Sequence, residues 1–436
     1  MRFLVMAAAL LIAGAAAAQE QPNAQAPGAT ERVYSAAKSK LLQIRSIVLA
    51  ANRQSSIGSA FLANADGIAI TNYHVVSQFV LEPETYRLEY IAADGGHGAV
   101  TVIAVDIADD LAAVRIARTG DKPADYLRFD ARALRGELPK GDRLHSLGNP
   151  LDLGFTVVDG TYSGDVERSY GERFHFSGAI NPGMSGGPTV TDDGLVVGVN
   201  VSKQTNGELV SFLVPARFAA ALLERAEKSP AADHADLRAE VGRQLSAWQA
   251  EFYRTFEEAK FREADFGPYL APESAAGWFT CWGSTNAGQL PAPRASVNTT
   301  NCFSNSQLFI AGDLTTGRIH LVNSHVRGVD LNAFQFATFL SAMTRAPQFG
   351  VQKKWFTAAR CREDFVESGG ANPPVYFSWC ARAYRPFADL YDVAVIAVTQ
   401  DRAEEALVSR LNLQAVSYDN ATAIGEAFLK ALQWKK

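Results

Sequence analysis

The sequence predicts an all-β unit, a helical linker and a mixed α+β unit, because the hydrophobic period changes twice along the chain. Short apolar runs separated by Gly, Asn and Asp turns fill the chain from about Glu31 to Pro215, which is typical of β-barrels or sandwiches. A helical period follows, and strands alternate with helices beyond Asp265. At 436 residues the chain is expected to contain at least two separately cored units.

Composition and charge exclude several classes of protein. Hydrophobic residues make up 47% of the chain and charged residues 20%, which is typical of a soluble globular protein rather than a disordered or fibrous one. The net charge of -5 is mild, and no basic block occurs. We therefore expect neither nucleic acid nor an anionic membrane as a partner.

The first 18 residues have the layout of a signal peptide. Arg2 precedes the apolar run Phe3 to Ala13, and small residues follow from Gly14 to Ala18. The run is too short to span a bilayer comfortably, so cleavage near Ala18 is favoured over retention as an anchor. We expect an exported protein, periplasmic or secreted, with no membrane span after signal cleavage.

The β-rich part begins after a leader, residues 19–45, that is rich in Gln, Ala and Pro at its start and ends in a short helix. Each apolar run that follows is short and bounded by turn residues, as strands are. The clearest expected strands are Ile57 to Leu62, Gly67 to Thr71 and Val100 to Val105.

Two helices are expected next, in the part that links the two units. Phe218 to Ala226 has a helical pattern, and His234 to Phe261 carries apolar residues at spacings of three and four. Pro230 marks the break between them. The apolar stripe of the longer helix consists of Leu237, Val241, Leu245, Trp248, Phe252, Phe256 and Ala259.

The C-terminal half alternates between strand and helix patterns, which predicts an α+β domain. Leu331 to Met343 and Ala421 to Trp434 have helical patterns. The expected strands are Gly277 to Cys281, Leu308 to Ala311, Arg318 to Val322, Val375 to Trp379 and Val393 to Val398.

All four cysteines lie in this C-terminal half. Export favours disulfides, because the compartment is oxidising. Cys281 is close in sequence to Cys302, and Cys361 to Cys380, so two local bridges are preferred among the three pairings. A zinc site is the alternative, but neither pair has the C-x-x-C spacing that places two thiolates on one metal.

Three segments carry residues suited to covalent chemistry. "AITNYHVV" contains His74, "DDLAAVRI" contains Asp110, and "INPGMSGGPTV" contains Ser185. Attack on an amide needs a hydroxyl, a base that takes its proton and a group that fixes the tautomer of the base. His, Asp and Ser supply these roles, although the neighbours Asp106 and Asp109 compete with Asp110.

The glycines around Ser185 suit a turn that binds an anion. Gly183 precedes the serine by two residues, and Gly186 and Gly187 follow it. Glycine tolerates the backbone angles that bring several N–H groups together. We therefore expect the N–H groups of Gly183 and Ser185 to form an oxyanion hole.

The three segments resemble the motifs of trypsin-like serine proteases, and most closely those of the HtrA/Deg branch. "GSAFLANADGIAITNYHVV", "LGNPLDLGFTVVDGTYSG" and "LVVGVNVSK" fit the same branch in order, and the resemblance spans roughly residues 46–218. It implies an all-β double barrel (chymotrypsin-like) of two six-stranded antiparallel barrels, with the site between them. It also selects Asp110, because the carboxylate in this family directly precedes an apolar strand.

The resemblance completes the expected domain organisation. After the signal peptide and the leader, residues 46–225 are the expected protease domain. Residues 226–264 are the helical linker, and residues 265–436 are a disulfide-containing α+β C-terminal domain without a motif that assigns its role.

Two departures from the family pattern stand out. Met184 precedes the serine where relatives carry Asn or Asp, which excludes a salt bridge from that position to a new N-terminus. The chain also lacks a PDZ signature after the protease segment, so the substrate recruitment and caging of that branch are not carried over.

The resemblance places Ala179 at the base of the primary pocket and Asn200, Val201 and Ser202 along the substrate-binding strand. Without a carboxylate at the base, a small or medium apolar side chain is the expected specificity. The sequence thus predicts an exported serine endopeptidase that acts on a protein or peptide substrate without cofactor or metal. A catalytically idle, protease-shaped binding or adaptor protein of the cell envelope is the alternative.

Overall fold

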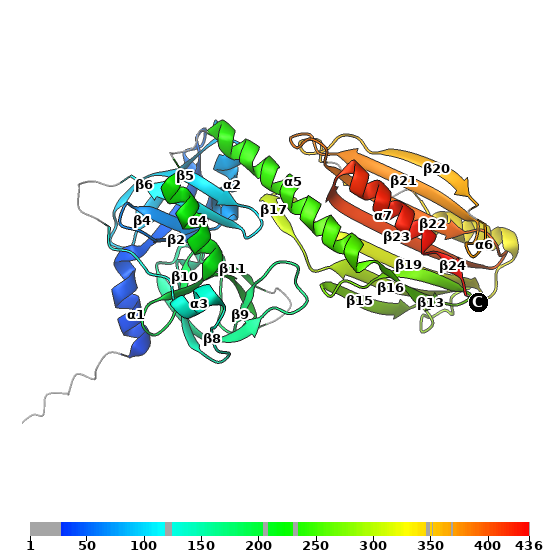
Figure 1. Ribbon diagram of the computed structural model, residues 1–436, viewed down its shortest axis with the longest axis horizontal. Coiled ribbons are helices and arrows are strands. Elements are labelled where there is room, and N and C mark those ends of the chain that lie inside the picture. Colours follow the sequence, from blue (N-terminus) through cyan, green and yellow to red (C-terminus); the bar gives the residue numbers. More distant parts are fainter. Residues whose placement is uncertain are drawn as a thin grey trace, which may run out of the picture.

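The structure is a computed structural model that describes residues 28–117, 124–203, 208–229, 234–345, 349–350, 352–367 and 369–435. Two lobes are joined by the long helix α5 (His234–Ala259), which runs from one lobe to the other in Figure 1. The N-terminal lobe holds two β-barrels, and the C-terminal lobe holds a large antiparallel sheet. The predicted signal peptide, its cleavage point and Pro230 lie outside the described residues.

The first barrel closes in the order β1-β2-β3-β6-β5-β4. It begins at Leu41, earlier than the predicted start at residue 46, because Leu41 to Ile44 are buried and pair with β2. The helix α2 (Tyr73–Leu81) lies between β3 and β4 and is largely buried. The strands are β1 (Leu41–Val48), β2 (Arg53–Leu62), β3 (Ile68–Thr71), β4 (Tyr86–Ala92), β5 (His97–Asp106) and β6 (Leu111–Ile116).

The second barrel closes in the order β10-β11-β12-β9-β8-β7. Aromatic and aliphatic side chains, among them Phe176 and Leu213, fill its interior. Two closed six-stranded barrels confirm the predicted all-β double barrel. The strands are β7 (Arg143–Gly148), β8 (Thr156–Asp165), β9 (Phe174–Phe176), β10 (Pro188–Val190), β11 (Val196–Lys203) and β12 (Ser211–Pro215).

Short helices cover the outside of the barrels. α1 (Ala29–Ala37) and α4 (Ala216–Lys228) contribute buried residues to one core together with strands of both barrels. In α4 the buried residues recur at helical spacing, as expected for an amphipathic helix that packs on one face. The remaining short elements of this lobe are α3 (Ala131–Arg135) and the 3₁₀ turns Lys38–Lys40 and Pro150–Asp152.

The predicted apolar stripe of α5 packs into both lobes. Its first half buries Leu237, Val241 and Leu245 against the first barrel and α2. Its second half buries Phe252 and Phe256 in the core of the C-terminal lobe. The helix therefore belongs to both lobes and fixes one to the other.

The C-terminal lobe is built on a seven-stranded antiparallel sheet in the order β15-β16-β19-β23-β22-β21-β20. Helices α7 (Tyr418–Lys430) and α5 pack on it, so the lobe is α+β as predicted. The sheet strands are β15 (Phe279–Thr285), β16 (Ala295–Ser304), β19 (Ile319–Gly328), β20 (Arg360–Val366), β21 (Val375–Ala383), β22 (Tyr391–Thr399) and β23 (Glu405–Val416).

Smaller elements complete this lobe. The helix predicted for Ala421 to Trp434 ends at Lys430, since Gln433–Trp434 instead form a short strand that pairs with β14. Helix α6 (Ala333–Met343) covers an apolar patch of the sheet. The small strands are β13 (Phe261–Phe266), β14 (Tyr269–Ser274), β24 (Gln433–Trp434) and the hairpin strands β17 (Leu308–Ala311) and β18 (Leu314–Thr316).

Two disulfides join neighbouring strands of the sheet. Cys281 on β15 is bonded to Cys302 on β16, and Cys361 on β20 to Cys380 on β21. Each pair consists of directly opposed residues in the strand register, with Cα atoms 4.0 Å apart. These are the two local bridges that the sequence predicts, and they leave no thiolate of these cysteines for zinc.

Within the described ranges, every helix is too short or too polar to cross a bilayer.

Candidate active site

His74 sits at the start of α2, where the chain leaves the first barrel. Strand β3 ends at Thr71, and Asn72 takes the N-cap position in extended conformation. The side-chain amide of Asn72 donates to the carbonyl of Asp110 over 2.8 Å, and the main-chain N–H of Tyr73 donates to the same oxygen over 3.1 Å. These bonds lock the first turn of α2 onto the turn between β5 and β6.

Asp110 holds His74 by both carboxylate oxygens. Its Oδ2 lies 2.6 Å from Nδ1 of the imidazole, and its Oδ1 accepts the main-chain N–H of His74 over 2.9 Å. A carboxylate can only accept, so Nδ1 donates and Nε2 is left with its lone pair for another donor. This is the tautomer that a general base needs.

The competing acids point elsewhere. Asp109 pairs with Arg173 at 3.2 Å, and Asp106 pairs with Arg225 at 3.1 Å. Burial raises the pKa of Asp109 to about 6, against the lowering effect of Arg173. Of the three neighbouring carboxylates, only Asp110 bonds to the His74 ring.

The pKa of His74 is raised above its usual value. Burial works to lower it, but the negative charge of Asp110 and the hydrogen bond to Nδ1 outweigh burial. The side chain is 26% exposed, so solvent and substrate can still reach it.

Ser185 lies in the glycine-rich turn between β9 and β10. The main-chain N–H of Ser59 on β2 donates to its carbonyl over 2.7 Å, which ties the turn to the first barrel. Its hydroxyl donates to the carbonyl of Val201 over 3.3 Å. Among the described contacts, no hydrogen bond joins this hydroxyl to His74, so His74 and Asp110 are in direct contact and Ser185 is bonded to neither of them.

Hydrogen bonds to the preceding carbonyls fix the orientation of the two predicted oxyanion donors. The carbonyl of Pro182 accepts from Leu151 N over 2.8 Å, and the carbonyl of Met184 accepts from Gly187 N over 3.0 Å. A trans peptide points its N–H opposite to its C=O. The N–H groups of Gly183 and Ser185, which belong to these two peptides, therefore point away from those anchors, and neither has an acceptor among the described residues.

Glycine is required at two positions of this turn. Gly183 has φ +95°, and a Cβ there would lie 2.4 Å from the carbonyl oxygen of Asn149. Gly186 has φ +85°, and a Cβ would lie 2.2 Å from the carbonyl oxygen of Ser59. Any side chain at either position would displace main-chain atoms of the opposite wall.

Ser59 holds the turn in place and was not identified from the sequence. Its buried hydroxyl donates to the carbonyl of Gly183 over 2.7 Å and accepts the N–H of Asn149 over 2.9 Å. It thus connects three separate segments behind the Ser185 turn. Serine follows Gly58 in an ordinary strand pattern, so no sequence signal distinguishes it.

The predicted substrate-binding residues have different surroundings. Ala179 is half-buried after β9, and Val201 is half-buried on β11. The Asn200 side chain is fully buried, where it donates to the carbonyls of Leu147 and Met184 and accepts from two hydroxyls, so this side chain supports the turn instead of facing a substrate. The side chain of Ser202 lies outside the described residues.

Comparison with known proteins agrees with this geometry. Residues 58–199 match the sequence profile described as "Trypsin-like peptidase domain". The chain therefore contains a trypsin-like peptidase domain.

The relatives of this domain are proteases of the HtrA/Deg type. A putative protease Do-like 14 of Arabidopsis thaliana is 32% identical over 40% of this chain and 42% of its own length. A probable periplasmic serine endoprotease DegP-like of Chlamydia pneumoniae is 31% identical over 38% of this chain and 34% of its own length. The chain thus spans less than half the length of each of these two relatives.

A structural comparison finds the serine endoprotease from Yersinia pestis. It is 22% identical in sequence, with a TM-score of 0.39, over 46% of this chain and 68% of the other.

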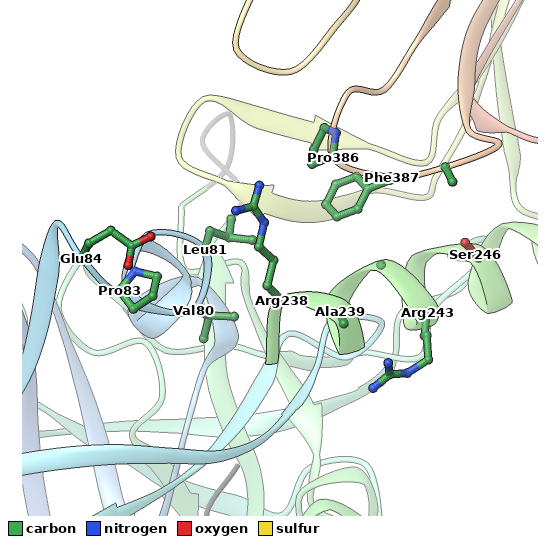
Figure 2. A pocket seen from close by; sticks show the side chains of 12 residues that line it. Val80, Leu81, Pro83, Glu84, Arg238, Ala239, Arg243, Ser246, Pro386 and Phe387 are labelled. Carbon is green, nitrogen blue, oxygen red and sulfur yellow. The ribbon is translucent and has the colours of Figure 1, made fainter. Parts of the chain in front are cut away.

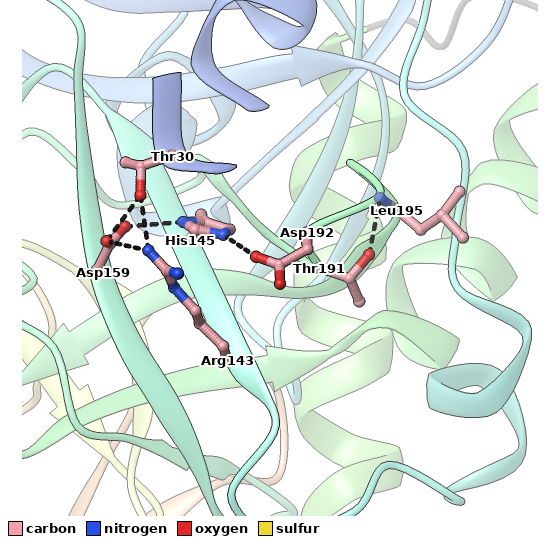
Figure 3. Close-up of polar contacts among 7 residues, drawn as sticks. All are labelled: Thr30, Arg143, His145, Asp159, Thr191, Asp192 and Leu195. Atoms are coloured by element: carbon pink, nitrogen blue, oxygen red, sulfur yellow. Dashed lines mark hydrogen bonds and ion pairs between the residues drawn. The ribbon is translucent and has the colours of Figure 1, made fainter. Parts of the chain in front are cut away.

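A second histidine of the trypsin-like domain is bound by two carboxylates. His145 on β7 is fully buried, with Nδ1 2.7 Å from Asp159 and Nε2 2.6 Å from Asp192 (Figure 3). Burial works against ionisation of Asp159, but hydrogen bonds from Thr30, His145 and Arg143 lower its pKa. Because both ring nitrogens are engaged, His145 joins β8 to the turn after β10 and is not placed to act as a base, while Thr30 of α1 donates to Asp159.

A pocket of about 870 Å³ lies away from the triad, where the two lobes meet (Figure 2). It is bounded by the end of α2, by one face of α5 and by the loop after β21 that carries Phe387. None of the triad residues lines it.

Proposed function

We propose that this chain is an exported serine endopeptidase that hydrolyses peptide bonds through an acyl-enzyme, with Ser185 as nucleophile, His74 as base and Asp110 as orienting carboxylate. The observation that carries the proposal is the pairing of Asp110 with Nδ1 of His74, which leaves Nε2 as an acceptor. The names of the relatives support the same chemistry.

In the first half-reaction, rotation of the Ser185 side chain moves its hydroxyl from the Val201 carbonyl to Nε2 of His74. His74 takes the proton as Oγ attacks the substrate carbonyl, and then gives that proton to the leaving amine as the C–N bond breaks. In the second half-reaction, water loses a proton to His74 and attacks the ester carbonyl. His74 then returns this proton to Oγ as the C–O bond to Ser185 breaks, which releases the acid and restores Ser185.

The N–H groups of Gly183 and Ser185 bind the oxygen that becomes negative in each tetrahedral intermediate. Donors fixed in advance stabilise this charge without reorganisation, and one such donor accounts for about 10²- to 10³-fold in rate. The N–H groups of Leu151 and Gly187 bind the carbonyls that share a peptide with these two donors, and this fixes the orientation of the donors.

The proposed specificity is for a small or medium apolar side chain before the scissile bond. Ala179 and Val201 are uncharged and half-buried, so neither supplies a partner for Arg or Lys. Export is supported by the two disulfides, which persist in oxidising compartments, and by the word "periplasmic" in the name of the Chlamydia relative.

One observation favours the alternative of an idle, protease-shaped binding protein: the Ser185 hydroxyl donates to Val201 rather than to His74. Catalytic hydrogen bonds often tighten only when substrate binds, so this geometry is compatible with an active enzyme. The two functions differ in whether Ser185 can be activated.

Fluorophosphonate labelling of the purified protein, read by intact mass, separates them. The endopeptidase predicts one adduct per chain, which disappears in Ser185→Ala. Folded wild-type protein that takes up no adduct would reject the proposal and favour the binding function.

A further inference from the structure

A hairpin of the C-terminal lobe packs on the catalytic helix of the other lobe. Strands β17 and β18 follow β16 in the chain, but in Figure 1 β17 lies apart from the seven-stranded sheet, on the side of the barrels. Leu308, Ile310 and Leu314 are buried in the same core as α2 and the first barrel. The hairpin is therefore part of the hydrophobic core beneath His74.

A hydrogen bond, in addition to apolar contacts, holds the hairpin against α2. The register of β17 with β18 shifts between Phe309 and Ala311, which leaves Ile310 in a bulge without a partner in the ladder. The phenol of the fully buried Tyr73 donates to the carbonyl of Ile310 over 3.0 Å. Since a buried carbonyl without a donor is costly, this bond fixes the hairpin at the residue that directly precedes His74.

Phe309 reaches the catalytic ring itself. Its ring centroid lies 5.7 Å from that of His74 with an interplanar angle of 65°, and 6.4 Å from that of Tyr73. Such edge-to-face contacts have a preferred geometry and restrict ring rotation. Asp110 holds the imidazole at Nδ1, and Phe309 supplies an aromatic contact from a different part of the chain.

The other end of the hairpin is fixed to the C-terminal sheet. The phenol of Tyr384 donates its single proton to Asp392 over 2.7 Å, so the hydroxyl of Thr316 on β18 donates to the Tyr384 oxygen. Asp392 in turn accepts from Arg382 at 2.8 Å. The position of Phe309 therefore depends on buried polar contacts in the sheet.

We propose that Phe309 is a positioning residue for His74, through which the C-terminal lobe contributes to the orientation of the catalytic base. Misplacement of a catalytic group by about 1 Å can cost up to about 10²-fold in rate. The hairpin thus makes turnover dependent on the presence of the C-terminal lobe. The expected effect on turnover rests on the proposed function. The effect of Phe309 on the orientation of His74 does not depend on it.

The test compares full-length Phe309→Ala, Phe309→Tyr and Phe365→Ala. Phe365 is 71% exposed on β20, so its loss controls for removal of a phenylalanine from the same lobe. The first measurement is fluorophosphonate inactivation, resolved into the maximal rate constant and the concentration for half-maximal rate. Phe309→Ala is expected to lower the maximal rate constant about tenfold with little change in the concentration term. Phe309→Tyr and Phe365→Ala are expected to keep the wild-type values.

The second measurement is the proton NMR signal of His74 Nδ1–H, recorded in a Ser185→Ala background and identified by its absence in His74→Gln. Phe309→Ala is expected to shift or broaden this signal while Phe365→Ala leaves it unchanged. Because this readout needs no turnover, it tests the positioning role even where wild-type protein takes up no fluorophosphonate, which is the outcome that rejects the proposed function.

Tyr73→Phe provides a second variant in case Phe309→Ala does not fold. It keeps the ring and removes only the bond to Ile310, so a smaller effect in the same direction is expected. Unchanged labelling kinetics and an unchanged His74 signal in a folded variant would overturn the proposal, as would an equal effect of Phe365→Ala.

Discussion

The carboxylate of Asp110 binds both the ring and the main chain of His74, with Oδ2 2.6 Å from Nδ1 and Oδ1 2.9 Å from the main-chain nitrogen. One side chain thereby sets the tautomer of the base and the start of α2. Asp110 itself has φ +57°, a left-handed conformation that Asn also adopts readily.

Asp110→Asn is therefore expected to fold normally and to lose most activity. The amide can donate to Nδ1, which favours the tautomer in which Nε2 carries the proton and cannot accept one. Loss of this function typically costs about 10⁴-fold in turnover. The labelling rate with fluorophosphonate measures the effect, and circular dichroism checks the fold; labelling at the wild-type rate would remove Asp110 from the triad.

The pH dependence of labelling should report the raised pKa of His74. The base works only when neutral, so the rate should rise with pH through the His74 pKa, with a midpoint above the usual value of about 6.5. In Asp110→Asn the attraction to the charged imidazole is gone, so the residual activity should have its midpoint at lower pH. A midpoint that does not differ between the two proteins would contradict this origin of the shift.

Ser59→Ala should destabilise the catalytic turn. It leaves the carbonyl of Gly183 and the N–H of Asn149 without their buried partner, at a cost of about 1 to 3 kcal/mol for each group left unsatisfied. Labelling should also slow, because the peptide that follows Gly183 is no longer fixed. Ser55→Ala, on the same strand but exposed, is the matched control and should leave both the denaturation midpoint and the labelling rate unchanged.

Local patterns predicted much of this molecule. Short runs bounded by turns indicated the barrels, and the seven-residue stripe of α5 indicated a helix with one apolar face, which packs into both lobes. The cysteine pairs could be predicted because each bridge joins adjacent antiparallel strands that are close in sequence, with separations of 21 and 19 residues. The pairing of Asp110 with His74 could be expected because the resemblance places a carboxylate directly before an apolar strand, whereas the catalytic roles of the three residues stay a prediction.

Contacts between distant segments could not be predicted. Tyr73 and Ile310 are 237 residues apart, and no periodicity states on which surface the hairpin packs. The predicted boundary between the linker and the C-terminal domain marks a change in sequence pattern, not an end of packing. Both α5 and β17 bury side chains in the core of the first barrel. Ser59 and the buried side chain of Asn200 show the same effect within the trypsin-like domain, since their hydrogen bonds to other segments give them roles that their own strands do not reveal.

Met184 is the clearest departure from the family pattern, and the structure gives it a packing role. It is fully buried in an apolar cluster with Ile180, Val197 and Leu213. Met184→Ala should lower the free energy of unfolding by about 2 to 5 kcal/mol, because it leaves a cavity beneath the turn. Met184→Leu, of similar volume, should cost less than about 1.5 kcal/mol.

Asp at position 184, one of the two residues that the resemblance leads us to expect there, should destabilise the protein more than truncation to Ala. Met184 is fully buried among apolar side chains, so Met184→Asp would place a carboxylate in apolar surroundings. We expect its denaturation midpoint to fall below that of Met184→Ala and to recover as the pH is lowered, because protonation removes the buried charge. A midpoint for Met184→Asp at or above that of Met184→Leu would mean that the turn rearranges to expose residue 184.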